Sequence, residues 1–501
     1  KERNNIECEN NFLFITKNIT HEQFPYWAMF ETKNPLVELY WAPFIICLSS
    51  KFGIVASVRI AETIWLVTTA SAIYVITAII GNRRSGLDSN IEMIRRHVIT
   101  LSFAALYLVL VLDVRVSDDG LNISMYQALP ELMAITVVLF FTNKRVWMHG
   151  ALLGVLFFLA WFVKQTSVLP VATIIACYII LRKSHITRYW WLGLFLGLTI
   201  PLAIFFMHLQ ITNTWENYWL GSHLYKGSLV TQGLQEFYVN AWNSFMVPDF
   251  LENISSFLIA HRIWSGITTI ILFICSIYNL YSTRTNGWTT ARLALAVSTC
   301  WMVTAYIQAV AGLLFFPHYF LASLAPVALV FSLLFLRISP LIQKVAGMIT
   351  VSSVLILLVG YSDMDEINRI RNRLVPINQS TEEVMQYIHP QDKVFNYSGM
   401  PHFVVAQGKK SAYPLNMNWP YIMKALPSET RNTMLRKTLS DPPDVVISIH
   451  EDYPPNQGLH KVPMTVDRLN NLTGHQYVLV HKTAPKKGRY GNPVHVFRRE
   501  K

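Results

Sequence analysis

Charged residues are scarce in this chain. Asp, Glu, Lys and Arg make up 14% of its 501 residues, whereas apolar residues make up 52%. Soluble globular proteins carry roughly 25% charged residues, so this composition excludes an ordinary soluble enzyme or binding module. The apolar residues gather in runs of membrane-spanning length, which is typical of a polytopic membrane protein.

Cysteines and short catalytic motifs are also scarce. The five cysteines are far apart, and no two of them form a Cys-x-x-Cys pair, which excludes a disulfide framework and a zinc site of the usual spacing. The chain also lacks a Walker phosphate loop, a Gly-x-Gly-x-x-Gly turn after a strand and a His-Glu-x-x-His motif. We therefore expect no nucleotide site and no bound cofactor. The sequence leaves metal dependence open.

A net charge of +12 suggests nucleic acid as a partner, but the distribution of the charge argues against it. The basic residues cluster in short loops between apolar runs, and every second loop is basic. The basic loops contain Arg83, Arg84, Arg95 and Arg96, then Lys144 and Arg145, then Arg182, Lys183 and Arg188, then Arg284 and Arg292, then Arg337 and Lys344. This alternation follows the positive-inside rule, so we expect membrane lipids and not nucleic acid as partners.

The apolar runs predict about ten or eleven spans of roughly 20 residues each. They lie at 55–80, 97–113, 131–142, 146–163, 165–181, 189–209, 257–280, 291–314, 318–336 and 344–361. The basic loops are then cytoplasmic, and the opposite face receives 1–54, 114–130, 164–165, 210–256, 315–318 and the tail after 361. The aromatic segment 35–50 favours a helix at the membrane interface rather than a span.

The tail differs in composition from the rest of the chain, with mixed charge and no apolar run of membrane length. Lys393–Tyr397 and Asp444–Ile449 are predicted strands, Thr381–Ile388 and Pro427–Leu439 are predicted helices, and the second strand is expected to be buried on both faces. This order indicates a small α/β domain outside the membrane. The predicted domains are an outer juxtamembrane segment with amphipathic helices (1–54), a transmembrane helical domain (55–361) and the α/β domain (362–501).

Polar residues gather where the predicted outer face meets the apolar runs. The candidates for chemistry are Glu7, Glu9, Tyr26, Lys33, Arg59, Glu131, Lys164, His223, His318 and Tyr319. A positioned carboxylate can act as a general base, and cations or a helix N-terminus can bind a phosphate group. Each type also has a structural interpretation: an interfacial aromatic belt, a carboxylate that complements a helix dipole, or a snorkelling cation.

Several of these segments, in this order, resemble the C-type (GT-C) membrane glycosyltransferases. The likeness is to the branch that contains dolichyl-phosphate-mannose–protein mannosyltransferases and the bacterial aminoarabinose transferases of lipid A. Residues 25–35 are similar to the family pattern P-Y-x-x-x-F-x-x-K-P-P, with Asn34 in place of the first of its two final prolines, and Cys8-Glu9 stands where the family has Asp-Glu. Further matches are Val58-Arg59-Ile60, Leu129-Pro130-Glu131, Gly150 to Pro170, Pro317 to Pro326 and the tail.

The resemblance implies transfer of a sugar, with inversion, from a polyprenyl phosphate such as undecaprenyl phosphate to a lipid, polysaccharide or protein acceptor. It implies that Glu9 is the base with Glu7 as a substitute, and that Glu131 orients the acceptor or shares that role. The residues implied for the donor phosphate are Lys33, Arg59, His318 and Tyr319, with Tyr26 and Lys164 as further substrate contacts. It also implies one more span before Lys1 and a bacterial inner membrane with the site facing the periplasm.

Two other classes stay open on the sequence alone. A lipid-linked polysaccharide ligase or polymerase would carry key residues in one long outer loop, and 210–256 with His223 and Lys226 is long enough. A transporter or flippase would have inverted repeats and helices broken at the bilayer midplane. No such symmetry appears in the sequence, which makes this class the weaker alternative.

Overall fold

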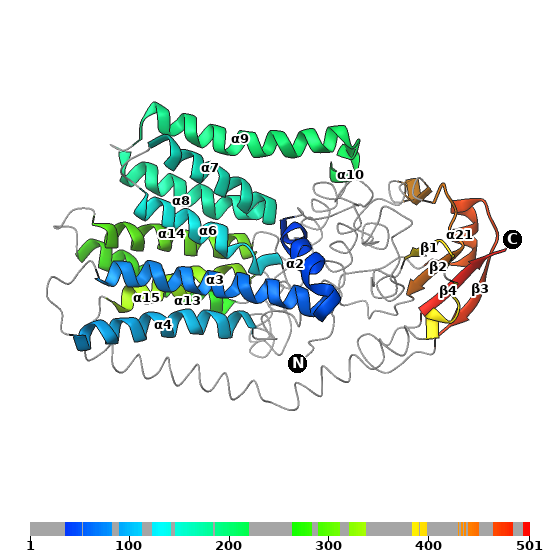
Figure 1. Ribbon diagram of the computed structural model, residues 1–501, viewed down its shortest axis with the longest axis horizontal. Coiled ribbons are helices and arrows are strands. Elements are labelled where there is room, and N and C mark those ends of the chain that lie inside the picture. The colour runs from blue at the N-terminus through cyan, green and yellow to red at the C-terminus, as the bar shows by residue number, and fades with distance from the viewer. Residues whose placement is uncertain are drawn as a thin grey trace, which may run out of the picture. The chain divides into compact units, whose positions relative to one another are not determined.

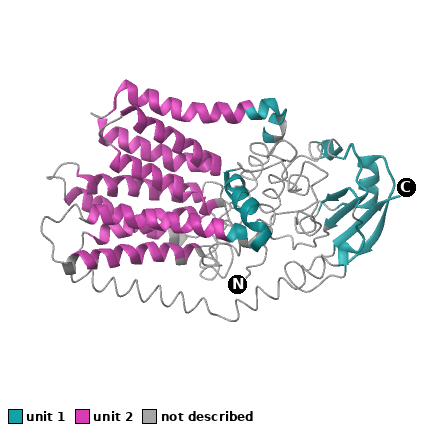
Figure 2. Cartoon of the chain, viewed as in Figure 1, with its two compact units in different colours: residues 1–59, 208–236, 363–501 teal, residues 60–207, 237–362 magenta. Residues whose placement is uncertain are grey.

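The computed structural model describes the chain in segments and divides it into two compact units (Figures 1 and 2). The described residues are 36–52, 54–82, 90–112, 123–141, 146–183, 186–219, 263–282, 289–310, 320–336, 383–389, 391–397, 429, 432–433, 435–436, 439–449, 464–483 and 494–500. Unit 1 comprises residues 1–59, 208–236 and 363–501, and unit 2 comprises 60–207 and 237–362. Each unit is described by itself below.

Apolar helices make up the described part of unit 2. They are α3 (Ile54–Asn82, which begins in unit 1), α4 (Asn90–Leu112), α6 (Ala128–Phe140), α7 (Val146–Val163), α8 (Val168–Leu181), α9 (Arg188–Ile211, which ends in unit 1), α13 (Ile263–Ser282), α14 (Thr290–Val310) and α15 (Leu321–Phe335). Two short 3-10 turns, η1 (Ile123–Met125) and η2 (Gln165–Ser167), precede α6 and α8. Unit 1 holds α2 (Leu36–Phe52) and α10 (Trp215–Trp219).

Four of the described helical segments are long and apolar enough to cross a membrane. They are Ser57–Gly81, Val146–Val163, Arg188–Ile211 and Thr290–Val310. The helices at Leu39–Phe52, Arg96–Leu108, Ala128–Phe140, Gln165–Leu181, Ile267–Ser282 and Leu321–Phe335 are apolar but shorter. The predicted helical segments are thus found wherever the chain is described, and their composition favours a membrane protein. The predicted span 344–361 lies outside the described residues, as do parts of 257–280, 291–314 and 318–336.

Two helices start clearly earlier than the predicted spans. Helix α4 starts at Asn90, before the predicted span 97–113. Helix α6 starts at Ala128, before the predicted span 131–142, whose short length already suggested an earlier start, and this puts Glu131 inside its first turn. The helix predicted over 35–50 is present as α2, with Pro43 inside it.

Helix α14 is the most buried of the four described segments that are long and apolar enough to cross a membrane. It packs against α6, α8, α13 and α15, and its buried residues include Arg292, Trp301 and Gln308. Polar side chains on such a helix must find partners within the unit, because neither lipid nor a packed core supplies hydrogen bonds. The polar partners of these α14 side chains must therefore come from the helices that pack against it.

Helices α7 and α9 meet through glycines. A Cβ atom added to Gly150 would lie 2.1 Å from the Trp190 carbonyl oxygen, and one added to Gly154 would lie 2.3 Å from the Leu194 carbonyl oxygen. On α9, a Cβ atom at Gly197 would lie 2.1 Å from the carbonyl oxygen of Ala151. The two backbones are therefore in direct contact, as small residues permit in membrane helices.

A four-stranded sheet forms the described core of the chain's C-terminal part. Strands β1 (Val394–Asn396) and β2 (Val445–Ile449) pair in parallel, and β4 (Val494–Arg499) pairs antiparallel with both β2 and β3 (Tyr477–Lys482), in the order β1-β2-β4-β3. The two predicted strands are confirmed, and Val445, Val446 and Ile447 are buried on both faces as expected. The sequence analysis missed β3, β4 and helix α21 (Val466–Thr473), which is capped by the Thr465 side chain and ends at Gly474 with φ 72°.

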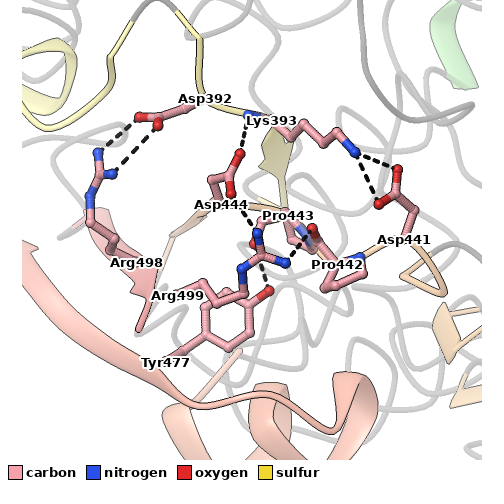
Figure 3. A network of polar contacts seen from close by, with 9 residues as sticks. All are labelled: Asp392, Lys393, Asp441, Pro442, Pro443, Asp444, Tyr477, Arg498 and Arg499. Carbon is pink, nitrogen blue, oxygen red and sulfur yellow. Dashed lines mark hydrogen bonds and ion pairs between the residues drawn. The ribbon is translucent and has the colours of Figure 1, made fainter. Parts of the chain in front are cut away.

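Ion pairs fix the amino ends of β1 and β2 against the end of β4 (Figure 3). The Arg498 guanidinium donates to the Asp392 carboxylate at 2.8 Å, and Arg499 donates to Asp444 at 2.7 Å. Burial alone would raise the pKa of the Asp392 carboxyl. The backbone N–H of His389 and the Arg498 guanidinium outweigh that effect and hold this pKa below its usual range.

Adding one methyl group at the α7–α9 contact should destabilise the protein. Gly154→Ala places a Cβ atom against backbone, which cannot move like a side chain, so we expect a loss of about 1–3 kcal/mol and a lower Tm in detergent. Gly81→Ala in α3 is the control, because its Cβ would lie 3.4 Å from the flexible Leu336 side chain. Equal melting temperatures for the two variants would contradict the direct backbone contact.

Stability of the sheet should depend on pH through Asp392. A carboxyl whose folded pKa is depressed stabilises the fold above its ordinary pKa of about 3.9, and this contribution is lost as pH falls through the lower, folded value. Hydrogen exchange of the β4 amides, corrected for the intrinsic effect of pH, should show less protection in Asp392→Asn than in the parent at pH 7. The difference should disappear in acid. Asp441→Asn is the control, since its ion pair with Lys393 is exposed and worth little.

Candidate functional site

Polar residues from four segments of unit 2 meet at one end of its helices. We name Ser124, Gln127, Glu131, Lys164, Thr166, Ser167, Trp301 and Gln308 the polar cluster. They come from η1, the start of α6, the turn between α7 and α8, and α14. Buried polar groups in an apolar helical unit are costly, so such a cluster is a functional candidate.

Glu131 and Trp301 form the deepest contact of the cluster. The Trp301 indole nitrogen Nε1 donates a hydrogen bond of 2.6 Å to Glu131 Oε2, and both residues are fully buried. Glu131 also lies in the first turn of α6, where the helix dipole favours a negative charge. The carboxylate is therefore held in one orientation by a rigid donor.

Lys164 brings a positive charge into the same cluster. It begins the tight turn after α7, and its Nζ donates to Ser124 Oγ at 3.1 Å. Its ammonium group is close enough to Glu131 to interact electrostatically with the carboxylate. The hydrogen bond to Ser124 also joins the turn at 164–165 to the end of segment 114–130, which the sequence predicts to lie on the same face. The two opposite charges partly compensate each other, which lowers the cost of burying both.

Gln127 and Gln308 form a second contact nearer the ends of their helices. Gln308 Nε2 donates to Gln127 Oε1 at 2.5 Å and to Thr166 Oγ1 at 3.2 Å. Gln127 precedes Glu131 by one turn of α6, and Gln308 follows Trp301 by two turns of α14. Thr166 is exposed, whereas Gln308 is only 7% exposed and Gln127 is fully buried. The cluster thus runs from the surface of the unit into its interior.

Several buried polar atoms of the cluster have hydrogen-bonding capacity left over. Glu131 Oε1, Gln127 Nε2, Gln308 Oε1 and Ser167 Oγ have no hydrogen-bond partner in the part of the chain that the structure describes. An unsatisfied buried polar group costs about 1–3 kcal/mol, and native proteins contain few of them. Four in one place indicate a site that a polar ligand or water completes.

Only three of the predicted site residues fall within the described segments. Glu131 and Lys164 are brought together in the polar cluster. Arg59 lies in the first part of α3, half-buried, three residues before the buried Glu62 of the same helix. The others lie outside the described residues: Glu7, Glu9, Tyr26, Lys33, His223, His318 and Tyr319.

Sequence reasoning missed Trp301, Gln127 and Gln308 as site residues. The signal was present for Gln308, because a glutamine in the apolar run 291–314 needs a hydrogen-bond partner there. For Trp301 no such signal exists, since tryptophan is common in apolar helices and its N–H partner is 170 positions away in the chain. Glu131 and Lys164 were recognisable because charges interrupt apolar runs.

The described residues offer little for a metal ion. Within them, no group of three or more His, Cys, Asp or Glu side chains is placed to hold one. The four described cysteines, Cys47, Cys177, Cys275 and Cys300, are free thiols. In chemical terms the polar cluster offers one carboxylate, one ammonium group and several neutral donors and acceptors.

Comparison of the chain with family models, with curated proteins and with solved structures finds no match.

Removing the indole donor should destabilise unit 2. Trp301→Phe keeps the ring but leaves Glu131 Oε2 without this hydrogen bond, which should cost about 1–3 kcal/mol and lower the Tm in detergent. The control is Trp191→Phe on α9, because that side chain is 49% exposed. A Tm shift no larger than that of the control would mean that the hydrogen bond contributes nothing to stability.

Proposed function

We propose that this protein is an inverting glycosyltransferase that moves a sugar from a polyprenyl phosphate to an acceptor at the non-cytoplasmic face of a membrane. One observation supports this most. Glu131, in the first turn of α6, and Lys164, directly after α7, lie in one cluster at one end of the helical unit. The segments that resemble C-type glycosyltransferases, and the predicted outer face of both residues, add to it.

The cluster offers the two charges that such a reaction needs. In the proposed reaction, an acceptor hydroxyl or amine attacks the anomeric carbon from the side opposite the phosphate. The bond from the anomeric carbon to the phosphate oxygen breaks, its electron pair leaves with polyprenyl phosphate, and the acceptor's proton passes to a carboxylate. A positioned base contributes on the order of 10²–10⁴-fold, and a fixed cation stabilises the charge that develops on the leaving group.

We assign the catalytic roles of the cluster residues from their charge and their burial. Lys164, at the half-buried end of the cluster, binds the donor phosphate. Glu131, which Trp301 orients, positions the acceptor and shares in taking its proton. We propose that Glu9, or Glu7 in its place, is the main base and that Lys33, Arg59, His318 and Tyr319 complete the phosphate site. Tyr26 is proposed as a substrate contact.

The apolar surface of the helices suits a lipid-linked donor. Helix α9 carries large exposed apolar side chains along its length, among them Phe195, Ile200 and Ile204. Such a surface is stable only against hydrocarbon, so a donor with a polyprenyl chain can reach the polar cluster from within the membrane. A water-soluble nucleotide sugar has no corresponding binding motif in the chain.

Loss of either charge should slow transfer strongly. Membranes that contain the protein are incubated with undecaprenyl phosphate carrying labelled glucose, galactose, mannose or aminoarabinose, together with an envelope extract as acceptor source. We expect release of undecaprenyl phosphate from at least one donor. Lys164→Met should reduce the rate on the order of 10²–10³-fold, as removal of a comparable donor does, and Glu131→Gln should reduce it by about 10²-fold or more.

Matched controls separate catalysis from folding. Glu429→Gln and Lys51→Met alter exposed residues of the same types, and they should keep the parent rate. No release from any of the four donors by the parent protein, or full activity in Lys164→Met, would refute the proposal. Loss of activity in His223→Ala together with full activity in Glu9→Gln and Glu131→Gln would instead favour the polysaccharide ligase.

A further inference from the structure

The neutral half of the polar cluster suggests which sugar the donor carries. We propose that Gln127, Gln308, Thr166 and Ser167 form a subsite for the hydroxyl groups of an uncharged sugar. This inference rests on the proposed function, which assigns the charged half of the cluster to phosphate and acceptor. It adds the chemical class of the transferred group.

The amide pair offers one donor and one acceptor whichever way its side chains are oriented. With Gln308 donating to Gln127 at 2.5 Å, Gln127 Nε2 and Gln308 Oε1 are left without partners among the described residues. If both amides are turned over, Gln127 donates, and its oxygen and the Gln308 nitrogen are left instead. Either way one N–H₂ group and one carbonyl oxygen remain, which is the combination that a sugar hydroxyl satisfies as both acceptor and donor.

The unpartnered polar atoms of the subsite are buried, which indicates that a ligand binds them. Gln127 and Ser167 are fully buried and Gln308 is 7% exposed, so bulk water does not satisfy their free atoms. Thr166 is exposed and bonded to Gln308, and it therefore marks the side from which a ligand approaches. The two amide groups hold each other in place, so they lose little conformational entropy when a sugar binds, and this favours binding.

The charges of the cluster argue against a charged sugar. In the described residues of the cluster, the charges are one carboxylate, Glu131, and one ammonium group, Lys164, and these act on each other. The four residues proposed for the subsite are all neutral. An aminosugar at this place would need a carboxylate beside it, and a uronic acid would need a cation, since an unpaired buried charge is very costly. Amides and hydroxyls instead suit a neutral hexose or pentose.

Binding of matched lipids tests the subsite without any assay of turnover. The protein in lipid nanodiscs is titrated with undecaprenyl phosphate, undecaprenyl-phosphate glucose, galactose or mannose, and undecaprenyl-phosphate aminoarabinose. We expect at least one neutral-sugar lipid to bind more tightly than bare undecaprenyl phosphate. The gain should be about 30- to 140-fold for two or three hydrogen bonds at roughly 1 kcal/mol each, since 1.4 kcal/mol is tenfold.

The test variants remove the amides in two ways. Gln308→Leu should abolish the gain from the sugar and leave the affinity for bare undecaprenyl phosphate within about twofold, because the phosphate site is separate. The double variant Gln127→Leu with Gln308→Leu should behave in the same way. It removes both partners of the amide pair, so no buried amide is left unpaired, and it keeps the test valid if the single variant folds poorly. Gln210→Leu, on the exposed end of α9, is the matched control.

The outcomes separate this inference from the proposed function. If bare undecaprenyl phosphate and every sugar lipid fail to bind the parent protein, both are overturned. If undecaprenyl phosphate binds but the double variant keeps the gain from the sugar, the subsite alone is wrong. Tighter binding of the aminoarabinose lipid than of every neutral one would overturn the assignment to an uncharged sugar.

Discussion

A carboxylate buried among apolar helices needs a fixed partner, and in this protein Trp301 supplies it. The 2.6 Å hydrogen bond to Glu131 ties α14 to the first turn of α6. The buried Glu131 carboxylate is not solvated by bulk water, so this hydrogen bond fixes its orientation and thereby the direction of its second oxygen, Oε1. Lys164 and the amide pair are arranged around this fixed carboxylate. The proposed division into a charged half and a neutral half follows from this single contact.

Hydropathy and charge predicted the helical elements well, because apolar runs and basic loops depend on composition over many residues. The helix of residues 54–82 and the strands β1 and β2 follow from such patterns. The start of α6 was misplaced, because Pro130 looked like a first helical residue whereas the helix begins at Ala128. Strands β3 and β4 were missed, since short strands with several charged or polar residues have no strong period.

The candidate site was predictable only in part, and for a physical reason. A charged residue within an apolar run can be recognised from the sequence alone, so Glu131 and Lys164 could be predicted as site residues. Their contacts with Trp301 and Ser124 could not, because these depend on how α14 and η1 pack against α6 and the turn after α7. Gln127 and Gln308 lie 181 positions apart, and although Gln308 stands in an apolar run, the sequence does not show which residue is its partner. Neutral polar partners are the part of a membrane site that sequence patterns reveal least.

The direct contact of backbones between α7 and α9 has a mechanical consequence. Where side chains interlock, a helix can tilt by small steps as rotamers adjust, but glycines offer no rotamers. Carbonyl oxygens and Cα atoms that touch lose about a quarter to a half of their attraction when a gap of roughly an ångström opens between them. Along this stretch α9 therefore either keeps its backbone contact with α7 or loses it. A deformation of unit 2 near this contact moves α7 and α9 together.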